Sequence, residues 1–337
     1  MTFHDRFVTG RTCKRVVGAL TLAFAVAAAG AGAPPAAPAA TTTPITSSAC
    51  PQTVSGSVRL ETDLHCTDTS GLIVGADNTS IDLNGHKIVC TGSGYLGSCQ
   101  GGTTVQIGVD TNGYDSVHVF SHVTGGTIDG FDQGVFVRAL SDGAAVRQLM
   151  LTGPALAAVP PFRPAVFGVL VEGNHCLDGG VLVSGNEAEN HTTGIRVSDA
   201  SCVNVSDNYA HDNSGGDPDT LLAGIRLRNS SSNVVRGNLV TNNGGGVIEL
   251  PPDSGILIGN ASTGNQVVGN QVNGNNGEGI ATALGAAGNS ILNNEMRFNT
   301  QFDAFSDDSG ANSWNNNNRC RTQTSPQPPA GVCNPGE

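Results

Sequence analysis

The stretch GIRVSDASCVNVSDNYAHDN at 194–213 repeats itself along the chain, as GIRLRNSSSNVVRGNLVTNN at 224–243, GILIGNASTGNQVVGNQVNGNN at 255–276 and GIATALGAAGNSILNNEMRFN at 279–299. Each unit opens with glycine and alternating residues, which indicate a short strand with one buried face. A polar turn, a second apolar pair and two asparagines five residues apart follow. Opening glycines also stand at 134 and 168, and the intervals up to 279 are 34, 26, 30, 31 and 24 residues. A constant pattern with a varying period predicts a solenoid whose turns carry insertions.

These units are too short to hold a helix and a strand together. Their few Val, Ile and Leu residues become buried only if each unit stacks on the next, strand over strand at about 4.8 Å. The sequence therefore predicts an all-β fold, a single right-handed parallel β-helix. Asparagines at equivalent turns tolerate left-handed backbone and can form an amide ladder along the stack.

Two further segments carry the same pattern, IDLNGHKIVC at 81–90 and GGTIDGFDQGVFV at 125–137. With the repeats, they resemble the secreted right-handed β-helix repeat proteins of the pectate-lyase-like superfamily, over roughly residues 55–315. The resemblance implies a carbohydrate-active protein with this fold. It does not select one activity, because the scaffold hosts lyases, hydrolases, epimerases, adhesins and proteins without known chemistry.

The N-terminus has the pattern of a secretory signal. A basic start precedes the short apolar core GALTLAFAVAAAGAGA at 18–33, so we assign residues 1–40 to a signal segment and expect a secreted, extracellular protein. Residues 41–49 are predicted to be a flexible tether and 50–337 the β-helix domain. We expect an N-terminal cap near 50–70, a C-terminal lid beyond 315, and Trp314 in the core of the last rung. No later run is long enough for a membrane span.

The cysteines predict disulfides. Eight of the nine remain after residues 1–40 are removed, and an even number in an exported chain favours disulfides over a metal site, the alternative. Cys176 and Cys202 each follow an opening glycine by eight residues, which places them on adjacent rungs at a distance that a disulfide accepts. Local spacing predicts the pairs Cys50–Cys66, Cys90–Cys99, Cys176–Cys202 and Cys320–Cys333.

The charge balance excludes some partners. Removing residues 1–40 takes away four basic residues and one acidic one, so twelve Lys and Arg face 27 Asp and Glu, a balance of −15. This argues against nucleic acid, which requires a basic surface. We expect a monomer whose partner is a polysaccharide, acidic in character. Sites for neutral glycans usually present the faces of Trp or Tyr rings, and this chain has only one Trp and three Tyr.

Insertions before the opening glycines suggest where a site lies. They are GPALAAVPPFRPAVF at 153–167, GGDPDTLLA at 215–223 and GGGVIELPPDS at 244–254, and stacking should gather them on one side of the solenoid. Two of them carry the carboxylates that we select as candidate catalytic residues: Asp217, Asp219, Glu249 and Asp253. The alternative is that these acids are ordinary solvated turn residues.

Arginines on the adjoining strands are the candidate substrate-binding residues. If the residue after each opening glycine points inward, Arg196 and Arg226 point outward, one above the other. Arg228 falls in a second outward column with Arg138, Glu172 and Ser198. Stacked arginines repel each other unless carboxylates lie between them, so the alternatives are a surface ion network and a cleft for the carboxylate of an acidic sugar.

The resemblance implies two chemistries, elimination assisted by Arg or a cation and hydrolysis by paired carboxylates. The selected carboxylates and arginines are compatible with either reaction. The Asn-Thr-Asp, paired Asp and Gly-His-Gly pattern of polygalacturonases is absent, apart from Asp307-Asp308. The Asp-Pro-His-Asp motif of alginate epimerases is echoed by Asp217-Pro218-Asp219, with Asp in place of His. His211-Asp212 is predicted to lie in a solvated turn, with a general base as the alternative reading of His211. No cofactor is certain, and Ca²⁺ stays open although no D-x-D-x-D-G loop occurs.

Overall fold

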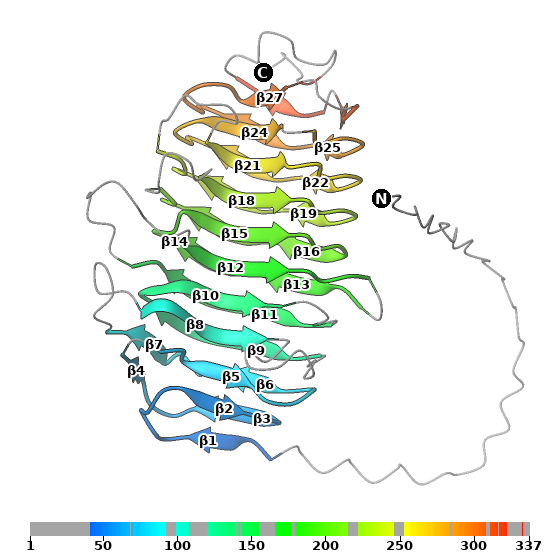
Figure 1. Ribbon diagram of the computed structural model, residues 1–337. Coiled ribbons are helices and arrows are strands. Elements are labelled where there is room, and N and C mark those ends of the chain that lie inside the picture. Colours follow the sequence, from blue (N-terminus) through cyan, green and yellow to red (C-terminus); the bar gives the residue numbers. More distant parts are fainter. Residues whose placement is uncertain are drawn as a thin grey trace, which may run out of the picture. The chain divides into compact units, whose positions relative to one another are not determined.

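The computed structural model describes residues 41–67, 69–91, 99–107, 120–138, 141, 143–154, 166–176, 179–214, 222–245, 253–283, 285–307, 311–315, 317–321 and 332, and only the backbone of 99–107. Within these residues the regular secondary structure consists of strands alone. The strands pair in parallel, each with its equivalent one rung away (Figure 1). No helix in this part of the chain is long and apolar enough to span a membrane.

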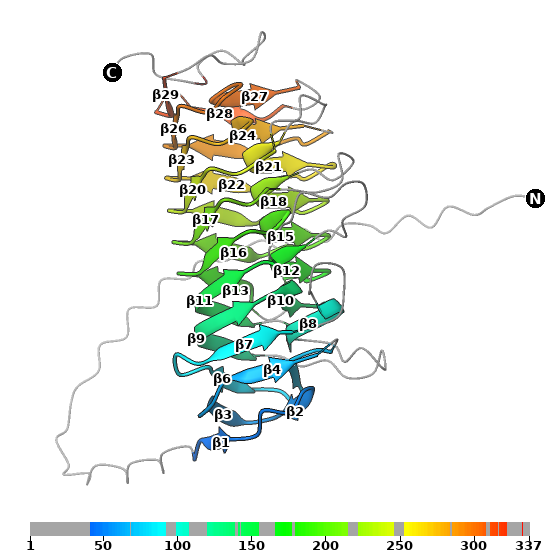
Figure 2. The same cartoon turned by 90° about the vertical axis from the view of Figure 1, so that its left-hand side faces the viewer.

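The strands form three faces (Figures 1 and 2). The first face is a ten-stranded sheet made of β2 (Gln52–Val54), β5 (Leu72–Val74), β8 (Cys99–Ile107), β10 (Phe131–Val137), β12 (Phe167–Glu172), β15 (Thr193–Ser198), β18 (Ala223–Arg228), β21 (Ser254–Gly259), β24 (Glu278–Thr282) and β27 (Ala304–Ser306). The second face contains β1 (Thr43–Ile45), β3 (Ser57–Leu60), β6 (Ser80–Asp82), β13 (Val181–Ser184), β16 (Val203–Ser206), β19 (Val234–Arg236), β22 (Gln266–Val268), β25 (Ser290–Leu292) and β28 (Ser313–Trp314).

The third face contains β4 (Leu64–Cys66), β7 (Lys87–Cys90), β14 (Glu187–Glu189), β17 (Tyr209–His211), β20 (Leu239–Thr241), β23 (Gln271–Asn273), β26 (Glu295–Arg297) and β29 (Arg319–Cys320). Two long strands, β9 (His122–Asp129) and β11 (Ala145–Thr152), pair with strands of both the second and the third face. They join these two faces into one sheet of 19 described strands.

The core is a stack of equivalent apolar side chains. Ile195, Ile225, Ile256 and Ile280 are register partners on successive rungs and are all buried, as predicted for the residue after each opening glycine. The glycine itself is required by close packing. A Cβ on Gly224 would lie 2.5 Å from Val240 Cγ1 and 2.7 Å from Asn243 Nδ2, so the turn asparagine of the same rung occupies the space that a side chain would need.

The asparagine ladders are confirmed. The Nδ2 of each Asn donates to the Oδ1 of its equivalent on the next rung; Asn208 to Asn238 and Asn213 to Asn243 are both 2.9 Å. A further ladder, which the repeat comparison missed, links the turn between the first and second faces through Asn233, Asn265, Asn289 and Asn312. One expectation was wrong. The left-handed residue is the one before the ladder asparagine, as at Asp207 (φ 57°) and Asn293 (φ 56°), because the preceding residue makes the bend that turns the Asn side chain inward.

The ends of the solenoid differ from the predicted cap and tether. β1 lies within residues 41–49 and pairs with β3, so the stacked strands begin inside the segment assigned to a tether. Residues 50–70 contain β2, β3 and β4, which are ordinary rung strands and not a separate cap. At the other end Trp314 pairs with Ile291 and is buried in the core, as predicted.

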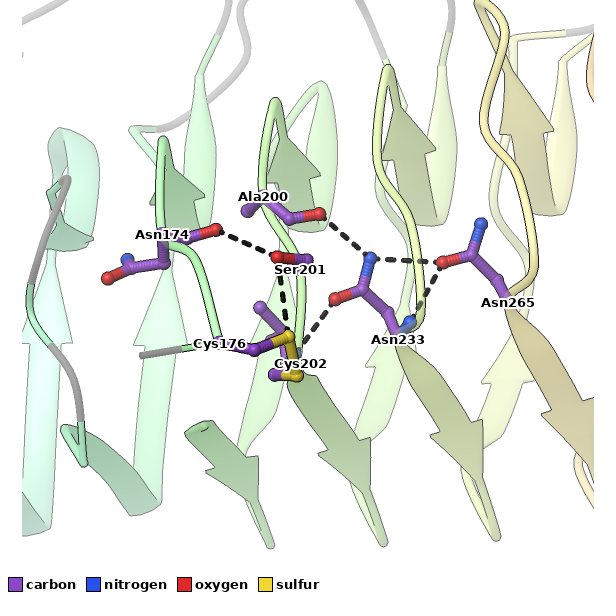
Figure 3. Close-up of a disulfide and its surroundings, with 8 residues drawn as sticks. Asn174, Cys176, Ala200, Ser201, Cys202, Asn233 and Asn265 are labelled. Atoms are coloured by element: carbon purple, nitrogen blue, oxygen red, sulfur yellow. Dashed lines mark hydrogen bonds between the residues drawn. A yellow bond between two sulfur atoms is a disulfide. The ribbon is translucent and has the colours of Figure 1, made fainter. Parts of the chain in front are cut away.

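Two disulfides are confirmed in full. Cys50–Cys66 and Cys176–Cys202 each have a Cα–Cα distance of 5.3 Å. Figure 3 shows the second of them beside Asn233, whose Oδ1 accepts from the backbone N–H that follows Cys202. Cys90 and Cys320 are also disulfide-bonded. Their predicted partners, the Cys99 side chain and Cys333, lie outside the described part of the chain.

Candidate functional site

The predicted arginine columns exist on the outer side of the first face. Arg196 of β15 is the register partner of Arg226 of β18, and Ser198 is the partner of Arg228. Glu172 precedes Ser198 in the same column, as expected. Because neighbouring strands are about 4.8 Å apart, the backbones place the three arginines in one cluster, which we call the arginine cluster (Arg196, Arg226, Arg228).

Apolar side chains flank the arginine cluster along the column. Phe136, Phe167 and Leu170 form one outward group, and Ala223, Leu257, Ala281 and Ala283 form another with Phe305. The guanidinium of Arg196 lies 4.8 Å from the ring centroid of Phe167. Apolar surroundings reduce dielectric screening, so charges in this cluster interact more strongly than charges on an open surface.

Burial and mutual repulsion both act on the charges of the cluster. Arg226 is 7% exposed, and burial together with the charges of Arg196 and Arg228 lowers its pKa to about 10. Burial and Arg228 also lower the pKa of Arg196. Both remain protonated at neutral pH. The nearby Glu172 and Asp199 carboxylates favour the charged form of Arg196. Arg196 Nε donates to Ser198 Oγ at 2.8 Å, and Arg228 Nη1 is 3.9 Å from Asp199 Oδ2.

Of the four candidate catalytic acids, the structure describes one. Asp217, Asp219 and Glu249 lie outside the described residues. Asp253 is 4% exposed, and its two carboxylate oxygens accept backbone N–H groups, from Leu222 at 3.2 Å and from Gly245 at 2.9 Å. These hydrogen bonds join the ends of two insertions, so Asp253 stabilises the backbone at this point.

A buried acid that the sequence pattern did not indicate lies next to Asp253. Glu278 begins β24, pairs with Ser254 and is 1% exposed. Its Oε2 has no hydrogen-bond partner among the described residues. Burial, with a contribution from the Asp253 carboxylate, raises the pKa of Glu278 to about 8, so the side chain is a neutral acid at pH 7. The sequence contains one sign of this buried acid. Glu278 is a charged residue at the start of a strand, and the equivalent positions on other rungs are the uncharged residues Thr193, Ala223 and Ser254.

His211, on the third face, is another ionisable side chain with a shifted pKa. Its predicted position in a solvated turn was wrong. It lies in β17 and is buried, because β17 extends one residue further than the pattern suggested. Its Nδ1 is 2.7 Å from Asp212 Oδ2 and its Nε2 is 3.0 Å from Glu187 Oε1. Burial disfavours the cation, but these two carboxylates outweigh it and raise the pKa of His211.

No set of three or more His, Cys, Asp or Glu side chains in the described part of the chain is arranged to hold a metal ion. The described side chains of the first face include the guanidinium groups of the arginine cluster and the neutral carboxyl of Glu278. Disulfides of this kind persist in an oxidising compartment and indicate an extracytoplasmic location.

Comparison with known families agrees with the stacked faces. Residues 165–319 match the family described as a right handed beta helix region. The chain contains a right-handed parallel β-helix. The predicted fold class and handedness are thus confirmed. A search of curated protein sequences found no match.

Solved structures with similar β-helices include two tailspike proteins. The Dettilon tailspike protein is 18% identical with a TM-score of 0.53, and the match covers 78% of this chain and 55% of that one. Tailspike protein 2 from a bacteriophage of Escherichia coli O157:H7 is 15% identical with a TM-score of 0.51, over 80% and 35% of the two chains. A periplasmic alginate epimerase is 15% identical with a TM-score of 0.46, over 74% and 57%. At these identities the similarity shows the fold alone, and the β-helix chain spans little more than half, or less, of these proteins.

Proposed function

We propose that this protein is an extracellular, carbohydrate-active β-helix that binds an acidic polysaccharide on its first face. The observation that carries the proposal is the arginine cluster, in which Arg196 and Arg226 are register partners on adjacent strands, Arg228 lies beside them, and their like charges repel one another. A sugar carboxylate between Arg196 and Arg226 would relieve the repulsion between them. It would also accept the paired N–H groups that a guanidinium presents.

Elimination is the reaction that an arginine cluster assists most directly. Neutralising the uronate carboxylate makes the C5 proton more acidic, because the charge left on C5 spreads into the carboxyl group. A base then removes that proton, and the C5–H electron pair forms the C4–C5 double bond. The C4–O bond breaks, its electron pair stays on the departing oxygen, and that oxygen takes up a proton. Asp217, Asp219 and Glu249 are the candidate bases. Hydrolysis instead needs a protonated carboxyl group to donate to the glycosidic oxygen and a carboxylate at a fixed separation from it.

Binding without catalysis is the second candidate function. Both oxygens of Asp253 are already bonded to backbone groups, and Glu278 is 1% exposed. Asp253 is thus engaged in structural hydrogen bonds and Glu278 is shielded from solvent, and the first face would act as a glycan-binding surface if the remaining acids do not converge on it.

The test is to measure binding and turnover of polygalacturonate and alginate by the full mature chain. Affinity electrophoresis reports binding, ultraviolet absorbance reports unsaturated products, and a reducing-end assay reports hydrolysis. We expect Arg196→Gln and Arg226→Gln to weaken binding at least about tenfold, since each removes a charge-assisted contact. Arg236→Gln is the matched control, because Arg236 lies on β19 of the second face.

The possible outcomes separate the proposals. Unsaturated products that disappear in the Asp219→Asn or Glu249→Gln variant support elimination, and new reducing ends alone support hydrolysis. Binding without either product supports the glycan-binding alternative. If neither polymer is retained, or if both arginine variants bind as the parent does, the arginine cluster is not an acidic-glycan site.

A further inference from the structure

The third face carries a narrow apolar strip that the arginine cluster does not explain. Met150 of β11, Tyr209 of β17 and Leu239 of β20 occupy one register column, with Glu187 of β14 between the first two. Their exposed fractions are 41%, 36% and 38%. Only two other large apolar residues in the described chain are comparably exposed, so three of five fall in this one column. We call it the apolar strip (Met150, Tyr209, Leu239).

Hydrogen-bonding side chains run beside the apolar strip. The neighbouring outward column, two residues further along each strand, is Thr152, Glu189, His211 and Thr241. Three of its members are held by hydrogen bonds: Thr152 Oγ1 donates to Glu189 Oε1 at 3.1 Å, and His211 lies between Glu187 and Asp212. The ring of His211 stacks on Tyr209 with centroids 4.0 Å apart, so the tyrosine is also held in place.

The apolar column continues into a polar groove. Leu239 is followed on successive rungs by Gln271, Glu295 and Arg319, and these three side chains line a groove of about 450 Å³ together with Asn293 and Asn317. This volume is in the range of small-molecule sites. Strip and groove are therefore one continuous track, apolar on its early rungs and rich in amide and charged groups on its later rungs.

Acidic and basic side chains alternate along this track. Glu295 Oε1 is 3.2 Å from Arg297 Nε, and Glu187 Oε1 is 3.0 Å from His211 Nε2. In the arginine cluster, by contrast, like charges repel each other. A track that carries both signs of charge attracts neither a polyanion nor a polycation strongly, and it favours an uncharged ligand that offers hydroxyl groups.

We propose that the track binds a strand of uncharged polysaccharide that runs along the solenoid axis. The apolar strip is one side chain wide and about 14 Å long from Met150 to Leu239, three rung steps. That area is far too small for a stable protein interface, which needs roughly 800 Å² on each partner. A sugar chain has the matching shape: its apolar C–H faces would lie on Tyr209 and Leu239, and its hydroxyl edges would bond the flanking side chains and the groove.

The experiment is affinity electrophoresis of the full mature chain in gels containing soluble β-glucan, xylan, mannan or dextran, with polygalacturonate as the acidic comparison. We expect retardation by at least one neutral polymer, and a loss of affinity of about tenfold in Tyr209→Ala and in Leu239→Ala. Phe120→Ala is the matched control, because Phe120 is an equally exposed apolar residue away from the strip. Thermal melting checks that each variant is folded.

Several results would overturn this proposal. They are the absence of retardation by all four neutral polymers, unchanged affinity in both strip variants, or a concentration-dependent dimer that Leu239→Ala abolishes, which would assign the strip to a second copy of the chain. Arg226→Gln separates the two sites. It should leave neutral-polymer binding unchanged while weakening polygalacturonate binding, and failure on one polymer class leaves the other proposal standing.

Discussion

Asn238 illustrates how single residues hold the rungs together. Its Oδ1 accepts from both the backbone N–H and the Nδ2 of Asn208, at 3.0 and 2.9 Å. Its own Nδ2 donates to Val205 O at 3.0 Å and to Asn270 Oδ1 at 2.9 Å. All of these groups are buried, so each depends on the ladder for its hydrogen bonds.

We predict that Asn238→Ala lowers the free energy of unfolding by about 3 kcal/mol, because the Asn208 N–H and the Val205 carbonyl lose buried partners. Urea denaturation followed by circular dichroism measures the change. The matched control is Asn204→Ala, since Asn204 lies on the outward side of β16 and is only half-buried. Equal effects of the two substitutions would contradict the ladder as a source of stability.

His211 makes stability depend on pH. Its folded-state pKa is raised because Asp212 and Glu187 outweigh the effect of burial. The charged groups around it are Glu187 and Glu189 on β14 and Asp212 on its own turn. A group with a raised folded pKa contributes stability that is fully present below its unfolded pKa, near 6.5, and is lost as pH rises through the folded value.

We therefore predict that the parent chain is more stable than His211→Gln at pH 6, and that this difference shrinks as the pH is raised above about 6.5. Urea midpoints of both proteins across this range test the sign. A difference that grows with pH would show that the carboxylates do not stabilise the imidazolium.

At the scale of the element, each rung contacts mainly the rungs above and below it. The Cys176–Cys202 disulfide joins two such rungs across 26 residues. In a solenoid, a local constraint should act on the rungs that it joins and only weakly on distant ones.

We predict that Cys176→Ser/Cys202→Ser lowers the free energy of unfolding by about 3 kcal/mol, with the loss of protection concentrated between β12 and β16. Amide hydrogen exchange read by mass spectrometry shows where protection is lost. Uniform loss from β3 to β28 would mean that the solenoid unfolds as one cooperative unit.

At the scale of the whole molecule, the open ends of the stack are its weak points. Trp314 ends the interior column that runs through Val205, Val235, Val267 and Ile291. Its bulk fills the apolar core at β28, and Val332 further along the chain is buried in the same core. A much smaller side chain at 314 would leave a cavity there and loosen the end of the sheet.

We predict that Trp314→Ala costs about 4 kcal/mol and frays β25 to β28 first. Hydrogen exchange should show the fraying, and light scattering should show concentration-dependent association through the exposed end. Trp314→Phe, which keeps an aromatic ring in place, should behave almost as the parent does. If the alanine variant neither frays nor associates, the tail beyond this residue protects the end by itself.

The repeat by itself determined the fold, because one pattern of inward Ile and Val, opening glycine and turn asparagine has only one way to bury its apolar residues. It also determined the register, and with it the arginine column and the Cys176–Cys202 pair, since equivalent positions must meet on adjacent rungs. Only the tertiary structure decided the burial and protonation of Glu278, the hydrogen bonds of Asp253, and the exposure of Met150, Tyr209 and Leu239. Those properties depend on which groups surround a side chain in space, and the spacing of residues along a strand does not contain that information.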